Sequence, residues 1–369
     1  MAGYVAGEPA VTTTDYLKLT AYFAERLRHE HRFVADALLD LYGGSDIAVS
    51  VMLRGISSFG PHHHLRTDET LTGSEDPPIT IAAVDAADKI SALAEQTVEL
   101  VPRGLITLER ARLIRGQSPA PSVPVATDFA KLTVYVGRHH RVGGVPAYRA
   151  VCDLLHQRGF AGATVFLGVD GTAHGQRRRA AFFSRNTEVP LMIIGLGTGA
   201  QVNEVLGELT DLLENPLLTV ERAQLCKRGG QLLTRPAELP GADAEGRRLW
   251  QKLMVHTSET AHHDGVPIHR AIVRRLMQTG AAGGATVLRA VWGFSGADKP
   301  HGDRLFQFGR QVPVTTIVVD TPERIAGAFE IIDELTREHG VVSAEMVPSA
   351  TVVDAGHRLG GTDLARFSY

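Results

Sequence analysis

The spacing of hydrophobic positions along the chain switches between the two-residue period of a strand and the longer period of a helix. Residues 131–136, KLTVYV, alternate apolar and polar side chains, which predicts a strand. Farther along, Ile268, Ala271, Ile272 and Leu276 recur at the spacing of one helix face. Read in this way, the sequence predicts the order strand, helix, strand, long loop, strand, helix, strand.

This order occurs three times, because three kinds of landmark return at nearly constant offsets. They are a lysine in the first strand, a proline before the third strand and a glutamate in the last strand: Lys18, Lys131 and Lys252; Pro78, Pro190 and Pro313; Glu109, Glu221 and Glu345. We therefore predict modules at 16–116, 128–227 (the most degenerate) and 249–349, linkers at 117–127 and 228–248, and an aperiodic, mobile or draped C-terminal tail at 350–369.

The predicted fold class is α+β, with three βαββαβ modules of the split-βαβ or ferredoxin-like order. Two helices cover only one face of each sheet. The other face carries Tyr22, Tyr135 and Met254 and is too apolar to face water. We expect one pseudo-threefold body with the sheets inward and the helices outward. Modules strung out like beads are the alternative.

Composition narrows the class of protein. The 369 residues are 44% hydrophobic and 21% charged, and the net charge of −3 gives no support to binding of nucleic acid or a membrane surface. The two cysteines form no CxxC pair, and no signal peptide or membrane span is evident, so a reducing cytoplasm is expected. No common catalytic motif occurs. We expect no enzyme, although one surviving active site stays an alternative.

Several stretches carry a resemblance to a known family. They are KLTAYFAER at 18–26, LRGISSFG at 53–60, SEDPPITIAAVD at 74–85, LVPRGLITLERARL at 100–113, ATVLRAVWGFSG at 285–296 and QVPVTTIVVDTPERI at 311–325. Each module resembles the uncharacterised PII-like family known as domain of unknown function 190. PII-like proteins assemble as trimers, so this chain looks like such a trimer fused into one polypeptide, a monomeric pseudo-trimer.

The resemblance also implies a function. PII proteins are regulators that bind nucleotides in clefts between subunits. They act on channels, transporters or enzymes through the long loop between the second and third strands. By this resemblance, the expected ligand is a small anion, a nucleotide being the possible one, and the expected target is a membrane transporter, a channel or an enzyme. No other cofactor and no nucleic-acid partner are expected.

The long loops, at about 56–78, 169–190 and 291–313, are each basic or rich in histidine. They are either docking or anion-binding loops or simply solvated. Arg54 and Arg289 end the second strand where this loop begins, and a guanidinium there suits phosphate or carboxylate. The alternative is an ion pair with Glu109 or Glu345. The second copy has Leu167 at this position, so the three clefts should be chemically unequal.

Further basic residues could join the same clefts. The full set of candidate ligand-binding residues is Arg54, Arg66, Lys89, Arg103, Arg289, Arg304, Arg310 and Arg324.

Two other patterns receive a plainer interpretation. Histidines at 62–64 and in the loop after each first strand could bind a transition metal, as in CutA-like trimers that resemble PII, but surface histidines explain them better. Gly195, Gly197 and Gly199 follow a strand with GxGxG spacing, which departs from the dinucleotide-binding GxGxxG and indicates an ordinary turn.

Overall fold

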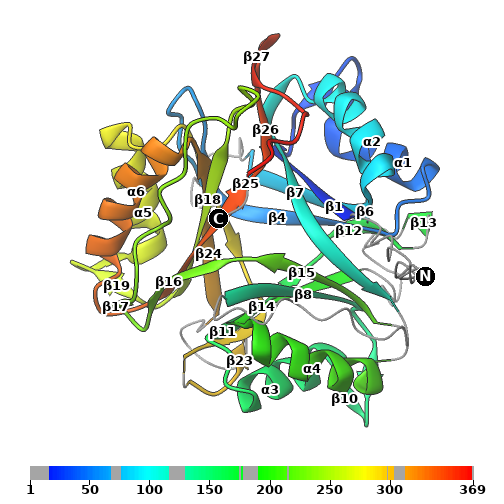
Figure 1. Ribbon diagram of the computed structural model, residues 1–369, viewed down its shortest axis with the longest axis vertical. Helices are drawn as coiled ribbons and strands as arrows, with labels where there is room; N and C mark the ends of the chain where they lie inside the picture. Colours follow the sequence, from blue (N-terminus) through cyan, green and yellow to red (C-terminus); the bar gives the residue numbers. More distant parts are fainter. Residues whose placement is uncertain are drawn as a thin grey trace, which may run out of the picture.

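A computed structural model describes residues 16–67, 76–115, 129–173, 176–177, 190–213, 216–296, 298–302 and 312–367. Within these ranges, six helices and a large curled antiparallel sheet form a mixed α/β fold made of three repeats. The helices lie in three pairs at the periphery, and the strands occupy the space between them (Figure 1).

The first repeat has the element order that the sequence predicts. Its elements are β1 (Tyr16–Ala24), α1 (Val34–Gly44), β4 (Val49–Phe59), β6 (Pro78–Ala86), α2 (Ala87–Leu100) and β7 (Arg103–Arg115), with short strands β2 (Arg28–His29), β3 (Arg32–Phe33) and β5 (Arg66–Thr67) in the connections. Antiparallel pairing places the strands side by side in the order β4, β6, β1, β7.

The other two repeats follow the same plan. The second contains β8 (Phe129–Gly137), β9 (Arg141–Val142), β10 (Val145–Pro146), α3 (Ala147–Gln157), β11 (Gly162–Leu167), β12 (Asp170–Ala173), β13 (Gln176–Arg177), β14 (Pro190–Thr198), α4 (Gly199–Leu212) and β15 (Leu217–Arg222). The third contains β18 (Trp250–Ser258), β19 (His262–His263), β20 (Val266–Pro267), α5 (Ile268–Thr279), β21 (Ala285–Arg289), β22 (Trp292–Ser295), β23 (His301–Gly302), β24 (Pro313–Asp320), α6 (Pro322–Leu335) and β25 (Val341–Val347). Their strand orders are β11, β14, β8, β15 and β21, β24, β18, β25.

The last strands of the repeats connect them in a ring. The end of β7 pairs with β15 of the second repeat. The chain after β15 forms β16 (Gln224–Arg228), which pairs with β25 of the third repeat. The chain after β25 forms β26 (Ser349–Asp354), which pairs with β7 of the first repeat. Each repeat therefore donates one strand to the sheet of the next repeat in the sequence, and the third donates to the first.

The second strands close another ring in the opposite direction. The far half of β4 pairs with β21 of the third repeat, β22 pairs with β11 of the second, and β12 pairs with the near half of β4. Every boundary between repeats thus contains two donated strands. Backbone hydrogen bonds, as well as side-chain packing, therefore join the three repeats.

Four main groups of buried apolar residues fill the interior. Three of them lie between one sheet and its own pair of helices. The fourth lies between the inner sheet faces and includes Tyr135, Phe166, Trp250 and Leu288. Tyr22 and Met254 also belong to this central group, so the sheet faces that the sequence marks as too apolar for water face one another.

The C-terminal tail differs from the sequence-based expectation of an aperiodic, draped segment. Residues 349–354 form β26, which turns back into β27 (His357–Gly360). Val353 joins the core of the first repeat, which gives the tail a fixed place. The segment before β18 follows the prediction more closely, since only the short strand β17 (Gln231–Leu232) interrupts an irregular run. The predicted linker at 117–127 lies outside the described residues.

No helix in the described ranges has both the length and the apolar character needed to cross a membrane.

Candidate functional site

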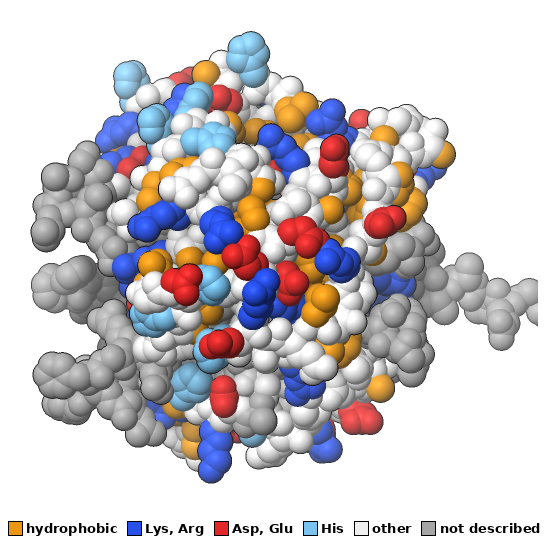
Figure 2. All heavy atoms as spheres, turned by 90° about the vertical axis from the view of Figure 1, so that its left-hand side faces the viewer, with side chains coloured by type: hydrophobic (Ala, Val, Ile, Leu, Met, Phe, Trp, Pro, Cys, Tyr) orange, Lys and Arg blue, Asp and Glu red, His pale blue; other side chains and the backbone are white. Residues whose placement is uncertain are grey.

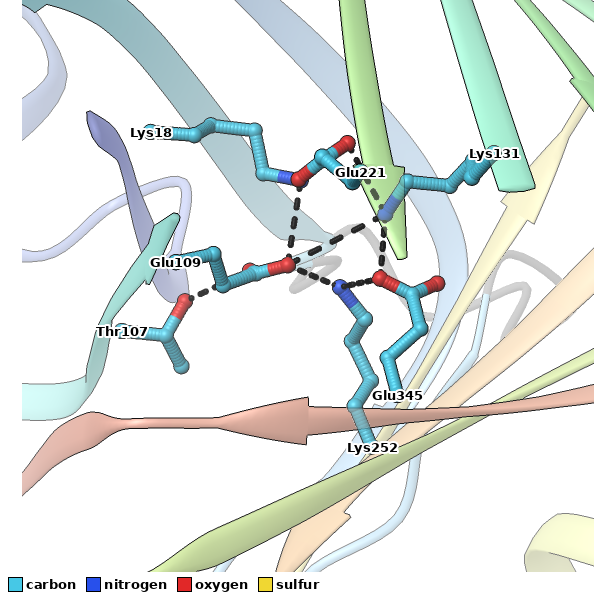
Figure 3. A network of polar contacts seen from close by, with 7 residues as sticks. All are labelled: Lys18, Thr107, Glu109, Lys131, Glu221, Lys252 and Glu345. Carbon is cyan, nitrogen blue, oxygen red and sulfur yellow. Dashed lines mark hydrogen bonds and ion pairs between the residues drawn. The ribbon is translucent and has the colours of Figure 1, made fainter. Parts of the chain in front are cut away.

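Six buried charged residues meet where the three repeats join (Figure 3). Each repeat supplies a lysine from its first strand and, directly opposite on its last strand, a glutamate. They are the repeat landmarks Lys18, Lys131 and Lys252 with Glu109, Glu221 and Glu345, which we call the axial network.

The ion pairs of the axial network run in a cycle. Lys18 Nζ lies 3.1 Å from Glu109 of its own repeat and also bonds Glu221 of the second repeat. Lys131 Nζ lies 3.1 Å from Glu221 and bonds Glu345 of the third repeat. Lys252 completes the cycle: it lies 2.9 Å from Glu345 and bonds Glu109 of the first repeat. Every lysine therefore links its own repeat to the next.

Burial and charge pairing act against each other in the network. Burial prevails at Lys18 and lowers its pKa, whereas charge pairing prevails at Glu109 and Lys131. Burial alone would raise the pKa of Glu109, but the positive charges of Lys18, Lys252 and Lys131 outweigh burial and hold this pKa well below its usual value. The converse holds for Lys131, where burial acts to lower the pKa and the surrounding glutamates raise it well above its usual value. Three lysines and three glutamates thus face one another in a buried site.

The three carboxylates lie close enough together to suggest a metal site, since one oxygen of each lies within 4.8 Å of the others. However, the three lysine ammonium groups already lie among these oxygens and neutralise them (Figure 3). The donor set therefore offers a divalent cation no net negative charge. The network is best suited to fixing how the three repeats join.

Arg54 and Arg289 lie elsewhere. Arg289 ends β21, as the sequence predicts, whereas Arg54 lies inside β4, because this strand continues to Phe59 and pairs there with β21. Their ion-pair partners are not Glu109 and Glu345, which the axial network occupies. Arg54 pairs with Glu25 at 2.9 Å, and Arg289 pairs with Glu259 at 2.7 Å. Both partners directly follow the first strand of the same repeat, β1 or β18.

These positions define what we call the strand-end site of each repeat. It comprises the last residue of the second strand that pairs with the third strand of the same repeat, the residue after the first strand and the second residue of the first helix. The three sites are Arg54, Glu25 and Ala35 in the first repeat, Leu167, Arg138 and Tyr148 in the second, and Arg289, Glu259 and His269 in the third. Because Leu288 pairs with Gly55 across the boundary, the backbones of Arg289 and Arg54 are neighbours.

The second strand-end site is filled by an aromatic residue of the third repeat. Trp292 contacts the ring of Tyr148 edge-on, with centroids 6.2 Å apart, and the guanidinium of Arg149 lies 4.3 Å from the centre of a Trp292 ring. Leu167 packs against the same core. This site therefore lacks the arginine–glutamate pair found in the other two.

The remaining candidate residues do not gather at one place. Lys89 and Arg324 each pair with an aspartate one helical turn earlier, Asp85 and Asp320, at 3.1 and 3.5 Å. Both pairs lie at the start of the second helix, at the opposite end of the sheet from Arg54 and Arg289.

Two further candidates lie near the first long loop. Arg103 pairs with Asp354 of the C-terminal hairpin at 2.9 Å, and Arg66 lies 3.8 Å from Asp76. Arg304 and Arg310 lie outside the described residues.

His62 and His63 make structural contacts, and the glycines of the GxGxG stretch lie in close packing. His62 bonds Asp354, and His63 bonds the carbonyl of Met277 in the third repeat. In the described ranges, the axial glutamates form the only group of three or more residues placed to share a metal ion. A side chain at Gly195 would lie within 3 Å of Leu155, and one at Gly197 would lie within 3 Å of Phe160. These glycines therefore allow β14 to pack closely against α3 and the turn that follows it.

One buried polar residue was missed by the sequence analysis. His256 stands where the other repeats have Tyr22 and Tyr135, and it lines a small cavity at the boundary of the second and third repeats. Its Nδ1 lies 3.0 Å from Thr315 Oγ1 and 3.3 Å from Thr164 Oγ1. Burial lowers its pKa from 6.5 to about 4, so the imidazole is neutral at pH 7.

Comparison with known proteins places the chain in a family. The sequence profile of domain of unknown function 190, described as "Uncharacterized ACR", matches three times in tandem, at residues 16–113, 129–225 and 250–349. The chain belongs to this family and carries three copies of its domain. It is also 29% identical over 96 residues to a UPF0166 protein of Aquifex aeolicus, an alignment that covers 26% of this chain and 88% of that relative. A single repeat thus corresponds to nearly the whole of that relative.

Proposed function

We propose that the protein is a non-catalytic regulator of the PII-like type, an intramolecular pseudo-trimer of three ferredoxin-like modules. In this proposal, a small anion, a nucleotide being the leading candidate, binds between repeats at the strand-end sites. The long loops that follow the second strands then act on a partner protein such as a transporter, a channel or an enzyme.

The observation that carries the proposal is the placement of Arg54 and Arg289. Each guanidinium lies beside a boundary between repeats and pairs with a carboxylate of its own repeat, and Arg289 also lies where the chain leaves β21 for the long loop. An anion that binds there would touch two repeats at once, beside the second strands that lead into the long loops. Exchange of the carboxylate for the anion would change what holds these strands, which gives a physical link from the ligand through the loop to a partner.

The cyclic strand pairing also supports the proposal. Each repeat completes the sheets of its neighbours, so a change at one boundary acts on backbone hydrogen bonds of two repeats. This arrangement is what a subunit-boundary sensor requires.

The test is binding of a panel of adenine and guanine nucleotides by isothermal titration calorimetry. A charge-assisted hydrogen bond contributes about 1.5–3 kcal/mol, so Arg54→Ala or Arg289→Ala should weaken binding about ten- to a hundred-fold. Substitution by Lys should restore only part of the affinity, because the two-pronged guanidinium geometry is lost.

The matched control is Arg275→Ala. Arg275 pairs with Glu334 at 2.9 Å on the outer helices, and its side chain is 43% exposed, close to the 51% of Arg54. This variant should bind nucleotide as the wild type does. Equal affinity in all three alanine variants would refute the assignment of the site, and absence of binding by any nucleotide would remove the nucleotide from the proposal.

A further inference from the structure

The strand-end site of the third repeat contains a buried group that the first repeat lacks. His269, the second residue of α5, is only 2% exposed, and its Nδ1 has no hydrogen-bond partner among the described residues. The corresponding residue of the first repeat is Ala35, which has no polar side chain. An unpartnered buried nitrogen is costly, so it indicates a position where a polar group binds.

Positive charge surrounds this imidazole from several elements. Arg270 follows it on α5, Arg289 ends β21, and His262 lies in β19. Burial and these three groups lower the pKa of His269 to about 4. Glu259 is the carboxylate of the site, and it is engaged by Arg289, although its Oε2 has no hydrogen-bond partner within the described ranges.

We propose that this site takes up an oxyanion together with one proton, with Arg289 binding the anion and His269 receiving the proton. The inference rests on the proposed function and assigns the ligand's charge class and an additional ligand-binding residue.

The physical reason is a balance of charge. Burial is the main reason why His269 is neutral, and the positive field adds to it; an oxyanion beside Arg289 offsets that field and raises the pKa of the imidazole, so protonation becomes more favourable. The protonated Nδ1 then donates a hydrogen bond to the anion, which satisfies the atom that has no partner in the free protein. The proton comes from solvent and returns there when the anion leaves. Binding at this site must therefore strengthen as pH falls, by the reciprocity of linkage.

The experiment uses sulfate as the probe, because its charge stays essentially the same from about pH 3.5 to pH 8, a range that includes the free-state midpoint of His269. Histidine ring signals of the whole protein are followed by NMR over this range, and the His269 signal is assigned by its loss in His269→Ala. The reference solution contains sodium chloride at the same ionic strength, which reproduces screening without an oxyanion.

In sulfate, the titration midpoint of His269 should rise by about one pH unit or more relative to chloride. Arg289→Ala should abolish this rise, whereas the control Arg275→Ala, on the outer helices, should leave it unchanged. A midpoint that is the same in both salts, or that rises equally without Arg289, would overturn the inference. Neither of these results decides the proposed function. The nucleotide titrations test that function separately, because they also measure the effect of Arg54→Ala.

Discussion

The axial network and the strand-end sites occupy equivalent positions in each repeat, yet they differ in how closely the repeats agree. All three repeats place a lysine and a glutamate in the axial network. The strand-end sites hold an arginine–glutamate pair, an aromatic plug and an arginine–glutamate–histidine cluster. The charges at the centre must match one another, because each side chain pairs with a second repeat. At the strand-end sites, each arginine–glutamate pair forms within a single repeat, so one pair can change without disturbing the other.

The strongest test of this contrast removes one charge from the centre. Lys131→Met leaves three buried glutamates facing two lysines, and breaking a buried ion pair costs about 3–5 kcal/mol. Urea unfolding should show this loss in the free energy of unfolding. The control Arg275→Ala should cost less than about 1 kcal/mol because its ion pair is exposed. A Lys131→Met variant as stable as the control would mean that the network does not hold the repeats together.

A smaller effect is expected on folding stability at acid pH. The unfolded chain protonates His256 below pH 6.5, whereas the folded chain keeps it neutral down to about pH 4. Folding stability from this residue is therefore complete above pH 6.5 and decreases as pH falls toward 4, with a loss of about 2 kcal/mol between pH 7 and pH 5.

His256→Asn retains a hydrogen-bonding group near Thr164 and Thr315 but has no titrating ring. The free energy of unfolding of this variant should decrease by about 2 kcal/mol less than that of the wild type between pH 7 and pH 5. His269 is present in both proteins, so its own titration cancels. Equal acid sensitivity of the two proteins would show that His256 is protonated in the folded state.

The smallest expected effect is on stability at the strand ends. Arg54→Ala and Arg289→Ala should each change the free energy of unfolding by less than about 1 kcal/mol, because these pairs are partly exposed to water. The same urea titrations measure this. If either variant lost as much stability as Lys131→Met, its arginine would be a structural residue, and the contrast between centre and periphery would fail.

The sequence predicts more of the fold than of the site. Repeat landmarks and alternating apolar positions suffice to place the strands and helices, since both depend on local spacing. The sequence contains one indication of the axial network: a lysine and a glutamate recur at the same positions in every repeat. Their contact could not be foreseen because it depends on how three sheets meet.

The same limit explains the wrong ion-pair partners suggested for Arg54 and Arg289. Glu25 and Glu259 lie near these arginines only because β6 or β24 places the first and second strands in one sheet. The tail was misjudged for a related reason. Residues 349–354 have too short an apolar pattern to indicate a strand until β7 of the first repeat offers an edge to pair with.

The donated strands have a consequence for how the protein is made. During synthesis the first repeat leaves the ribosome well before the third, yet β21 and β26, which complete its sheets, belong to the last third of the chain. Until they arrive, β4 and β7 present unpaired backbone at two edges, the kind of surface on which nascent chains associate wrongly. A polypeptide that joins three copies in one chain ensures that the missing strands come from the same molecule. Emergence of β26 from the ribosome is therefore the event that completes the sheet of the first repeat.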